Sequence, residues 1–158
     1  MAPMARALQG LPRALVPGIE VMPYSNAWSE EFAAAQDAAM AELSVAREMG
    51  TPTGYETAEG FDAFVVARQG ERILGFAQAA LPDGWINWLG VVPDARRRGI
   101  GHRLVAEIAR AVADARGTHL AALVEEETAG PAFLAALGFR SRARRLLMIR
   151  RAESAPAG

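Results

Sequence analysis

The chain has 158 residues, with 17 basic and 18 acidic side chains, a formal net charge of −1 and no cysteine. This is about the length of one domain and is enough to bury a core. The balanced charge argues against a nucleic-acid partner, and the lack of cysteine excludes disulfides, thiolate metal ligands and a cysteine nucleophile. All the basic residues are arginine, which also excludes chemistry that needs a lysine.

The distribution of apolar residues predicts a cytoplasmic protein with no membrane partner. Arginines and prolines break the first 20 residues, so they lack the apolar stretch of a signal peptide. Apolar runs such as 73–81 and 85–92 are far shorter than the ~18 residues of a membrane helix. We expect a flexible arm over residues 1–13, a single domain over 14–151 and a flexible tail over 152–158.

The N-terminal half predicts one strand and one helix, followed by a loop. Residues 15–24 could form a strand, which Pro17 and Pro23 would restrict to a sheet edge. The helix begins after Ser25 or Ser29 and ends near Gly50. Its apolar residues recur at helical spacing, namely Trp28, Phe32, Ala35, Ala39 and Leu43. The composition of residues 51–60 is typical of a loop.

Three strands are expected next, over residues 63–68, 72–81 and 85–92. Gln69-Gly70 separates the first two, and Asp83-Gly84 is typical of a two-residue hairpin turn between the last two. The three strands would therefore form an antiparallel meander.

The C-terminal half changes to a helical period. Residues 101–116 predict an amphipathic helix, 119–124 a buried strand, 131–138 a second helix and 139–150 a final strand. A strand, a helix and a strand in succession form a right-handed crossover with two parallel strands. The predicted fold class is α+β, a mixed and mostly antiparallel sheet with helices on its faces.

The segment from Leu89 to Leu104, LGVVPDARRRGIGHRL, carries the strongest chemical signal. The free amides at the start of a helix bind anions, and glycines at 99 and 101 would let a phosphate approach the backbone. Arg96, Arg97 and Arg98 add positive charge. A diphosphate at this helix start is one interpretation, and a glycine turn with solvated arginines is the other. A P-loop is excluded because there is no lysine, and a dinucleotide fingerprint lacks its third glycine because residue 104 is leucine.

The spacing Val91-x-Pro93-x-x-Arg96-x-x-Gly99-x-Gly101-x-x-Leu104 resembles the signature of the GNAT superfamily of acyl-CoA-dependent N-acyltransferases. Phe133-x-x-x-Leu137-Gly138-Phe139 and the element order are also similar to that family, and the resemblance covers about residues 14–150. It implies a GNAT-like sheet in which the strands 85–92 and 119–124 splay apart. Acetyl-CoA would be the co-substrate, with no metal. Dimers are common in the family, so a homodimer is also considered.

The resemblance further implies where acetyl-CoA binds. Its pantetheine arm would pair with the backbone of Leu89 and Val91. Its pyrophosphate would bind at the segment formed by Arg96, Arg97, Arg98, Gly99, Ile100, Gly101 and His102. An amine would attack the thioester directly in a ternary complex, helped by positioning and by backbone donors.

Two catalytic positions depart from the family pattern. Leu134 stands where many members have a tyrosine that protonates the thiolate, and the strand residues 85–88 (WINW) include no titrating group. Three explanations stay open, namely that no dedicated base is needed, that a glutamate relays the proton, or that the domain binds acetyl-CoA without efficient turnover. The candidate catalytic residues are Glu125, Glu126, Glu127 and Asn87, although the three glutamates could simply form a solvated loop.

The acceptor side is predicted to involve Tyr55, Glu56 and Trp85, with Trp85 and Trp88 on opposite faces of their strand. Acidic residues in the flanking loops favour a cationic amine. We therefore expect an N-acetyltransferase that acts on a small primary amine. The alternative is a non-catalytic acyl-CoA-binding or sensor module of the same fold.

Overall fold

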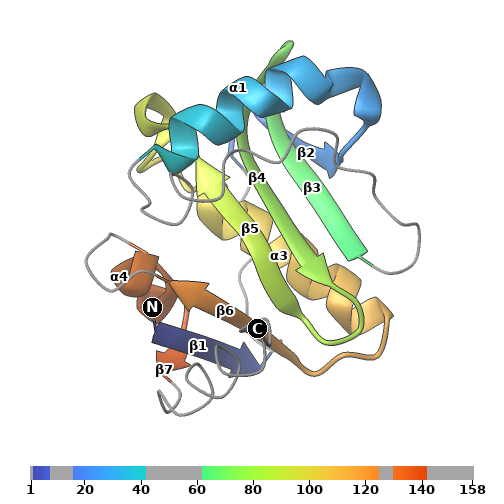
Figure 1. The fold of residues 1–158 in the computed structure, drawn as a ribbon, viewed down its shortest axis with the longest axis vertical. Helices are drawn as coiled ribbons and strands as arrows, with labels where there is room; N and C mark the ends of the chain where they lie inside the picture. The colour runs from blue at the N-terminus through green and yellow to red at the C-terminus, as the bar shows by residue number, and fades with distance from the viewer. Residues whose placement is uncertain (1, 8–15, 42–61, 125–129, 142–158) are drawn as a thin grey trace, which may run out of the picture.

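The computed structural model describes residues 2–7, 16–41, 62–124 and 130–141 (Figure 1). Along the chain, the elements are β1 (Ala2–Ala7), β2 (Glu20–Pro23), the 3-10 turn η1 (Asn26–Trp28), α1 (Ser29–Met40), β3 (Asp62–Gln69), β4 (Arg72–Ala80), β5 (Trp85–Val91), the 3-10 turn η2 (Pro93–Ala95), α3 (Ile100–Asp114), β6 (His119–Val124), α4 (Gly130–Ala136) and β7 (Arg140–Ser141).

The described strands form one seven-stranded sheet in the order β2-β3-β4-β5-β6-β1-β7. Its neighbouring strands pair antiparallel, except β5 and β6, which pair parallel. The helix α3 connects these two strands, as a parallel pair requires. The expected fold class, a mixed and mostly antiparallel sheet flanked by helices, is confirmed.

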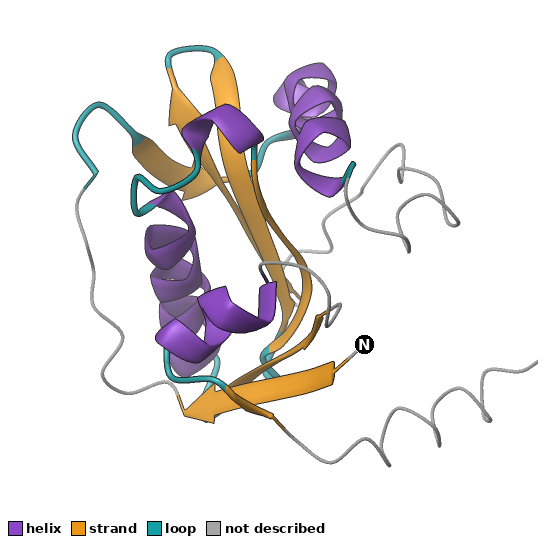
Figure 2. Ribbon diagram, turned by 90° about the vertical axis from the view of Figure 1, so that its left-hand side faces the viewer, coloured by secondary structure: helices purple, strands orange, loops and turns teal. Residues whose placement is uncertain are grey.

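Two helices cover opposite faces of the sheet (Figure 2). On one face, the Phe32 ring of α1 packs edge-on against Phe64 of β3 and Phe76 of β4, with ring centroids 5.2 and 5.3 Å apart. On the other face, a Cβ added to Gly75 of β4 would lie 2.9 Å from Leu104 of α3. Residues of β4 therefore alternate between the two helices, and β4 is buried along most of its length.

Most predicted elements form close to their expected positions. The strands β3, β4, β5 and β6 and the helix α3 begin and end within two residues of the prediction. The edge strand predicted over 15–24 is confirmed only as the four-residue β2. The helix α1 ends at Met40, with Ala41 as its C-cap, and not near Gly50 as predicted. Gly50 itself, the loop 51–60 and most of the strand 139–150 lie outside the described residues. No helix among the described residues is both long and apolar enough to span a membrane.

Residues 2–7, expected to belong to a flexible arm, instead form β1 within the sheet. This strand pairs with β6 over its whole length, from Ala2 opposite Val124 to Ala7 opposite His119, and with β7 at Met4 and Ala5. The Met4 side chain is only 4% exposed, and the Arg6 guanidinium donates to the Leu137 carbonyl. The prediction failed because the local sequence has little strand propensity, and only the neighbouring strands specify this conformation.

Two details around β5 also differ from the prediction. Residues 81–84 separate β4 from β5, so the turn is longer than the predicted two-residue hairpin. Gly84 has a φ of +72° and packs so closely on β6 that an added Cβ would lie 1.8 Å from the His119 carbonyl oxygen. The register also shifts, because Gln78 pairs with Trp88 but Ala79 pairs with Ile86. Asn87 is therefore an extra residue in β5.

We expect the substitution Met4→Ala to lower the free energy of unfolding by about 2–5 kcal/mol, because it leaves a cavity under β1. Urea denaturation followed by circular dichroism measures this change. A change below about 0.5 kcal/mol, as at an ordinary surface position, would show that residues 2–7 do not belong to the core.

Candidate functional site

The parallel pairing of β5 and β6 stops early and leaves part of β5 with an open edge. The two strands pair at Trp85 with Ala121 and at Ile86 with Ala122, and then they diverge (Figure 1). Among the described residues, no strand pairs with that side of β5 between residues 87 and 91. Backbone donors and acceptors on this edge need partners, so the edge can accept an extended ligand in the manner of an added strand.

The alternation of the antiparallel ladder identifies which groups face the open edge. The Val92 amide donates to the Leu74 carbonyl on β4, so alternate residues of β5, including Gly90, also direct their backbone groups toward β4. The backbone N–H and C=O groups of Leu89 and Val91 consequently point to the open side. These are the two residues predicted to pair with the pantetheine arm.

The helix α3 begins beside the end of β5, and its first amides have no partner within the helix. The first of its intrahelical bonds joins the Arg103 amide to the Gly99 carbonyl, 3.1 Å away. Gly99, at the N-cap, has no side chain to cap this end, and no acidic residue lies in the first turn. The amides of Ile100, Gly101 and His102 are therefore available to an anion, and the helix dipole favours negative charge there.

The two glycines of this segment serve different purposes. Gly99 has a φ of +85°, a left-handed conformation that glycine adopts without strain. A Cβ added to Gly101 would lie 2.8 Å from the Phe133 ring of α4. Gly101 therefore makes room for the Phe133 ring, a purpose that was not predicted beside the expected approach of a phosphate. The same ring contacts His102, with centroids 5.4 Å apart.

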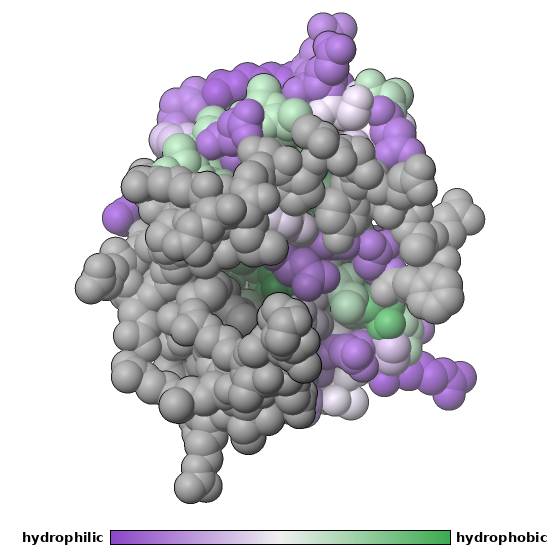
Figure 3. Space-filling view, viewed as in Figure 1, coloured by the Kyte–Doolittle hydropathy of each residue, from purple (hydrophilic) through white to green (hydrophobic). Residues whose placement is uncertain are grey.

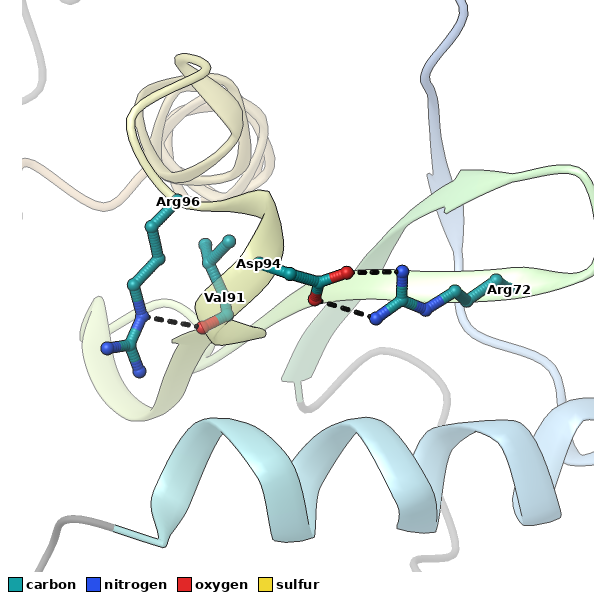
Figure 4. A network of polar contacts seen from close by, with 4 residues as sticks. All are labelled: Arg72, Val91, Asp94 and Arg96. Carbon is teal, nitrogen blue, oxygen red and sulfur yellow. Dashed lines mark hydrogen bonds and ion pairs between the residues drawn. The ribbon is translucent and has the colours of Figure 1, made fainter.

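The side chain of Arg96, an exposed residue, turns back to the end of β5 (Figure 4). Its Nε donates to the Val91 carbonyl at 3.0 Å, and its Nη2 donates to the Ala39 carbonyl of α1 at 3.4 Å. The residue therefore connects the loop to the end of β5 and to α1, and it occupies one acceptor of the open edge. Arg97 and Arg98 are exposed, and Arg97 has a positive φ of 66°.

An ion pair holds the preceding turn η2 against β4 (Figure 4). The Arg72 guanidinium binds both carboxylate oxygens of Asp94, at 2.8 and 2.7 Å. These hydrogen bonds lower the pKa of Asp94, and the nearby charge of Arg98 lowers it further. Because both side chains are exposed, we attribute orientation of the loop to this pair rather than a large part of the stability.

The face of the sheet under α1 carries a second group of polar and aromatic residues. Phe64, Gln78 and Trp88 are direct cross-strand neighbours on β3, β4 and β5. The Gln78 amide donates to the Asp62 carboxylate at 2.7 Å. Because Asn87 is an extra residue, the register places Trp85 on the same face as Trp88, so the prediction of opposite faces is wrong. The exposed side of α1 mixes hydrophilic residues with alanines (Figure 3).

The residues predicted for proton transfer are only partly described. Asn87 is exposed on β5, and Leu134 of α4 is 1% exposed, so it is a core residue. Glu125, Glu126, Glu127, Tyr55 and Glu56 lie outside the described residues. Two features were not predicted from the sequence, namely the contact of Phe133 with the helix start and the burial of Gln36 on α1. Gln36 is buried without a hydrogen-bond partner within the described part of the chain. Its one signal in the sequence is that a glutamine stands on the apolar face of a helix.

Comparisons with known proteins point to one family. Residues 60–141, more than half of the chain, match the model of the acetyltransferase (GNAT) domain. Among curated proteins, no relative matches this chain.

Solved structures share the fold at low sequence identity. A GCN5-related N-acetyltransferase from Kribbella flavida is 16% identical with a TM-score of 0.60, and the match covers 90% of this chain and 54% of that one. The tandem GNAT protein from the clavulanic acid biosynthesis pathway is 16% identical with a TM-score of 0.62, covering 89% and 49%. AAC(6')-Iy, solved with the bisubstrate analog CoA-S-monomethyl-acetylneamine, is 18% identical with a TM-score of 0.60, covering 80% and 93%. This chain thus spans about half of the first two proteins.

We expect Gly101→Ala and Phe133→Ala to be coupled. The first substitution forces the Phe133 ring away and the second removes that ring, so the double variant loses less stability than the sum of the single variants. A coupling energy of about 0.5–3 kcal/mol is typical for residues in contact. Urea denaturation of the three variants measures it, and strict additivity would show that Phe133 does not pack on Gly101.

We expect Leu134→Ala to act through stability, lowering the free energy of unfolding by about 2–5 kcal/mol because the side chain is buried. Under conditions where the variant is folded, its activity per folded molecule should equal that of the wild type. A lower rate at unchanged stability would show that this position takes part in the chemistry.

Proposed function

Since the chain belongs to the GNAT acetyltransferase family, we propose that it transfers an acetyl group from acetyl-CoA to a small primary amine. The observation that carries this proposal is the open edge of β5 next to the uncapped start of α3. An extended arm followed by a diphosphate fits this pair of features, because the arm needs backbone partners and the diphosphate needs free amides.

The described residues supply a group for each part of the co-substrate. The amide of Val91 and the amide and carbonyl of Leu89 would bind the arm, while Arg96 keeps the Val91 carbonyl occupied. The amides of Ile100, Gly101 and His102 would bind the diphosphate, and Arg97 and Arg98 would add positive charge. The carbonyl of the thioester would then lie near β5, where backbone donors polarise it.

We propose direct transfer in a ternary complex. The amine nitrogen attacks the thioester carbonyl carbon, the carbon–sulfur bond breaks, and the coenzyme leaves as a thiolate. The new amide nitrogen releases a proton to water. Within the described part of the chain, β5 carries no titrating side chain and residue 134 is leucine. Glu125, Glu126 and Glu127 stay candidates for a relay.

The buried leucine at position 134 also favours a second candidate function, a sensor that binds acetyl-CoA without turnover. In both cases the partner is a small molecule. AAC(6')-Iy binds an analog in which coenzyme A is joined to acetylneamine, which supports an amine as the acceptor.

We further propose that the protein is cytoplasmic. We also propose that it forms a homodimer in solution.

Thermal denaturation with acetyl-CoA, combined with detection of free thiol, tests both candidates. A ligand at 100 times its dissociation constant adds about 2.7 kcal/mol to the folded state, which raises the melting temperature. A transferase also releases free coenzyme A with some member of an amine panel, whereas a sensor binds and releases none. No shift with acetyl-CoA would contradict both candidates.

Two variants at Gly99 test the diphosphate site. Asparagine and aspartate both tolerate a positive φ, but only aspartate adds a negative charge beside the free amides. We expect Gly99→Asp to abolish the acetyl-CoA-induced rise in melting temperature and Gly99→Asn to retain most of it. Equal responses of the two variants would place the diphosphate elsewhere.

A further inference from the structure

The helix α1 carries a buried side chain whose polar atoms have no partner. Gln36 is 1% exposed, and within the described part of the chain neither its amide nitrogen nor its amide oxygen makes a hydrogen bond. Gln78 is equally buried, but it is hydrogen-bonded to Asp62. Buried polar groups are almost always paired, and an unpaired one destabilises the protein. Such a residue therefore suggests a missing ligand.

The neighbours of Gln36 place it between α1 and the sheet. Phe32, one turn before it, packs on Phe64 and Phe76. Ala39, almost one turn after it, lies over Gly90, where an added Cβ would be 3.0 Å from the Ala39 Cβ. Residues three or four positions apart lie on one side of a helix. Gln36 is thus buried on the side of α1 that packs on the sheet.

This position adjoins the open edge without being on it. Gly90, under Ala39, lies between Leu89 and Val91, whose backbone groups face the edge. The extended arm of the co-substrate would follow that edge in the plane of the sheet, whereas Gln36 lies above the plane, on the side that carries Trp88 and Gln78. A group that reaches Gln36 would therefore come from the molecule that approaches the thioester over this face, which is the acceptor.

The chemistry of a carboxamide limits what this group is. Its nitrogen donates two hydrogen bonds and its oxygen accepts two, and both atoms lack a partner. An ammonium would satisfy only the oxygen, and a carboxylate only the nitrogen. Burial of either ion would also be unfavourable without an opposite charge. A hydroxyl or an amide both donates and accepts, so a neutral group of this kind gives both the nitrogen and the oxygen of Gln36 a partner.

We propose that the Gln36 carboxamide binds a neutral hydroxyl or amide group of the acceptor, and so selects amines that carry such a group. This inference rests on the proposed transferase function and adds to it a determinant of acceptor specificity. Gln36 would cost stability in the free protein and contribute affinity only when the acceptor is bound.

The first arm of the test measures stability alone. Methionine has a similar size and helix propensity and no amide. Gln36→Met should raise the melting temperature of the free protein by about 2–4 °C, because it removes two unpaired polar atoms. The matched control Gln78→Met should lower it, because it breaks the bond to Asp62. A lower melting temperature for Gln36→Met would overturn the proposal, since Gln36 would then have a partner.

The second arm measures selection between amines of equal size, ethanolamine against propylamine and glycinamide against isobutylamine. The wild type should favour the first member of each pair in kcat/KM for thiol release. In Gln36→Met this preference should fall by about 10-fold or more, because the lost hydrogen bond leaves the polar group of the acceptor unpaired. The KM for acetyl-CoA should stay unchanged.

The outcomes of the second arm are distinguishable. An unchanged preference in Gln36→Met, or a wild type without one, would overturn the role in acceptor selection. A raised KM for acetyl-CoA with unaltered preference would instead assign the Gln36 contact to the coenzyme and would also overturn the proposal. If no amine supports thiol release, the transferase function itself would be overturned. The first arm would still show whether Gln36 is unpaired.

Discussion

The early end of the pairing between β5 and β6 is the constraint on which the site depends. Beyond Ile86 and Ala122 the two parallel strands diverge, and no strand of the described residues pairs with Leu89 and Val91 on that side. A sheet ordinarily hides such groups by pairing or covering its edges. Here the open stretch lies in the middle of the sheet, beside the start of α3, and of its outward backbone groups the Val91 carbonyl accepts from Arg96. We propose that the others bind a ligand rather than another strand.

The rest of the structure holds this open stretch in place. Arg96 joins the end of β5 to α1, and the bidentate pair of Arg72 and Asp94 fixes the turn between β5 and α3. Phe133 of α4 packs on Gly101, so the helix start is supported from the far side of the divergence. Each of these contacts connects elements on different sides of the site, and together they explain how a backbone site can be rigid without many buried polar side chains.

Much of the fold could be predicted from sequence because its elements are specified locally. The alternation and apolar runs of β3 to β6 and the helical period of α3 are strong signals, and the spacing of Pro93, Gly99 and Gly101 marked the helix start. The strand β1 could not be predicted, because its conformation depends on pairing with β6 and β7. Asn87 illustrates the same limit, because an extra residue in β5 is defined only by the pairing of β5 with β4. This extra residue changes the face of the sheet on which Trp85 lies.

The site was predictable in its backbone and not in its side chains. The resemblance to the family predicted a role for the backbone of Leu89 and Val91, and the alternation of β5 agrees with it by turning these groups to the open edge. The direction of the Arg96 side chain depends on α1, which is distant in sequence. Gln36 reads as an ordinary polar residue of a helix, and only its complete burial distinguishes it.

The most direct test of the proposed acetyl-CoA site is amide hydrogen exchange measured with and without acetyl-CoA. Protection should rise at Leu89, Val91 and Ile100–His102 when the ligand binds, and binding that leaves these amides unprotected would contradict the assignment of the site.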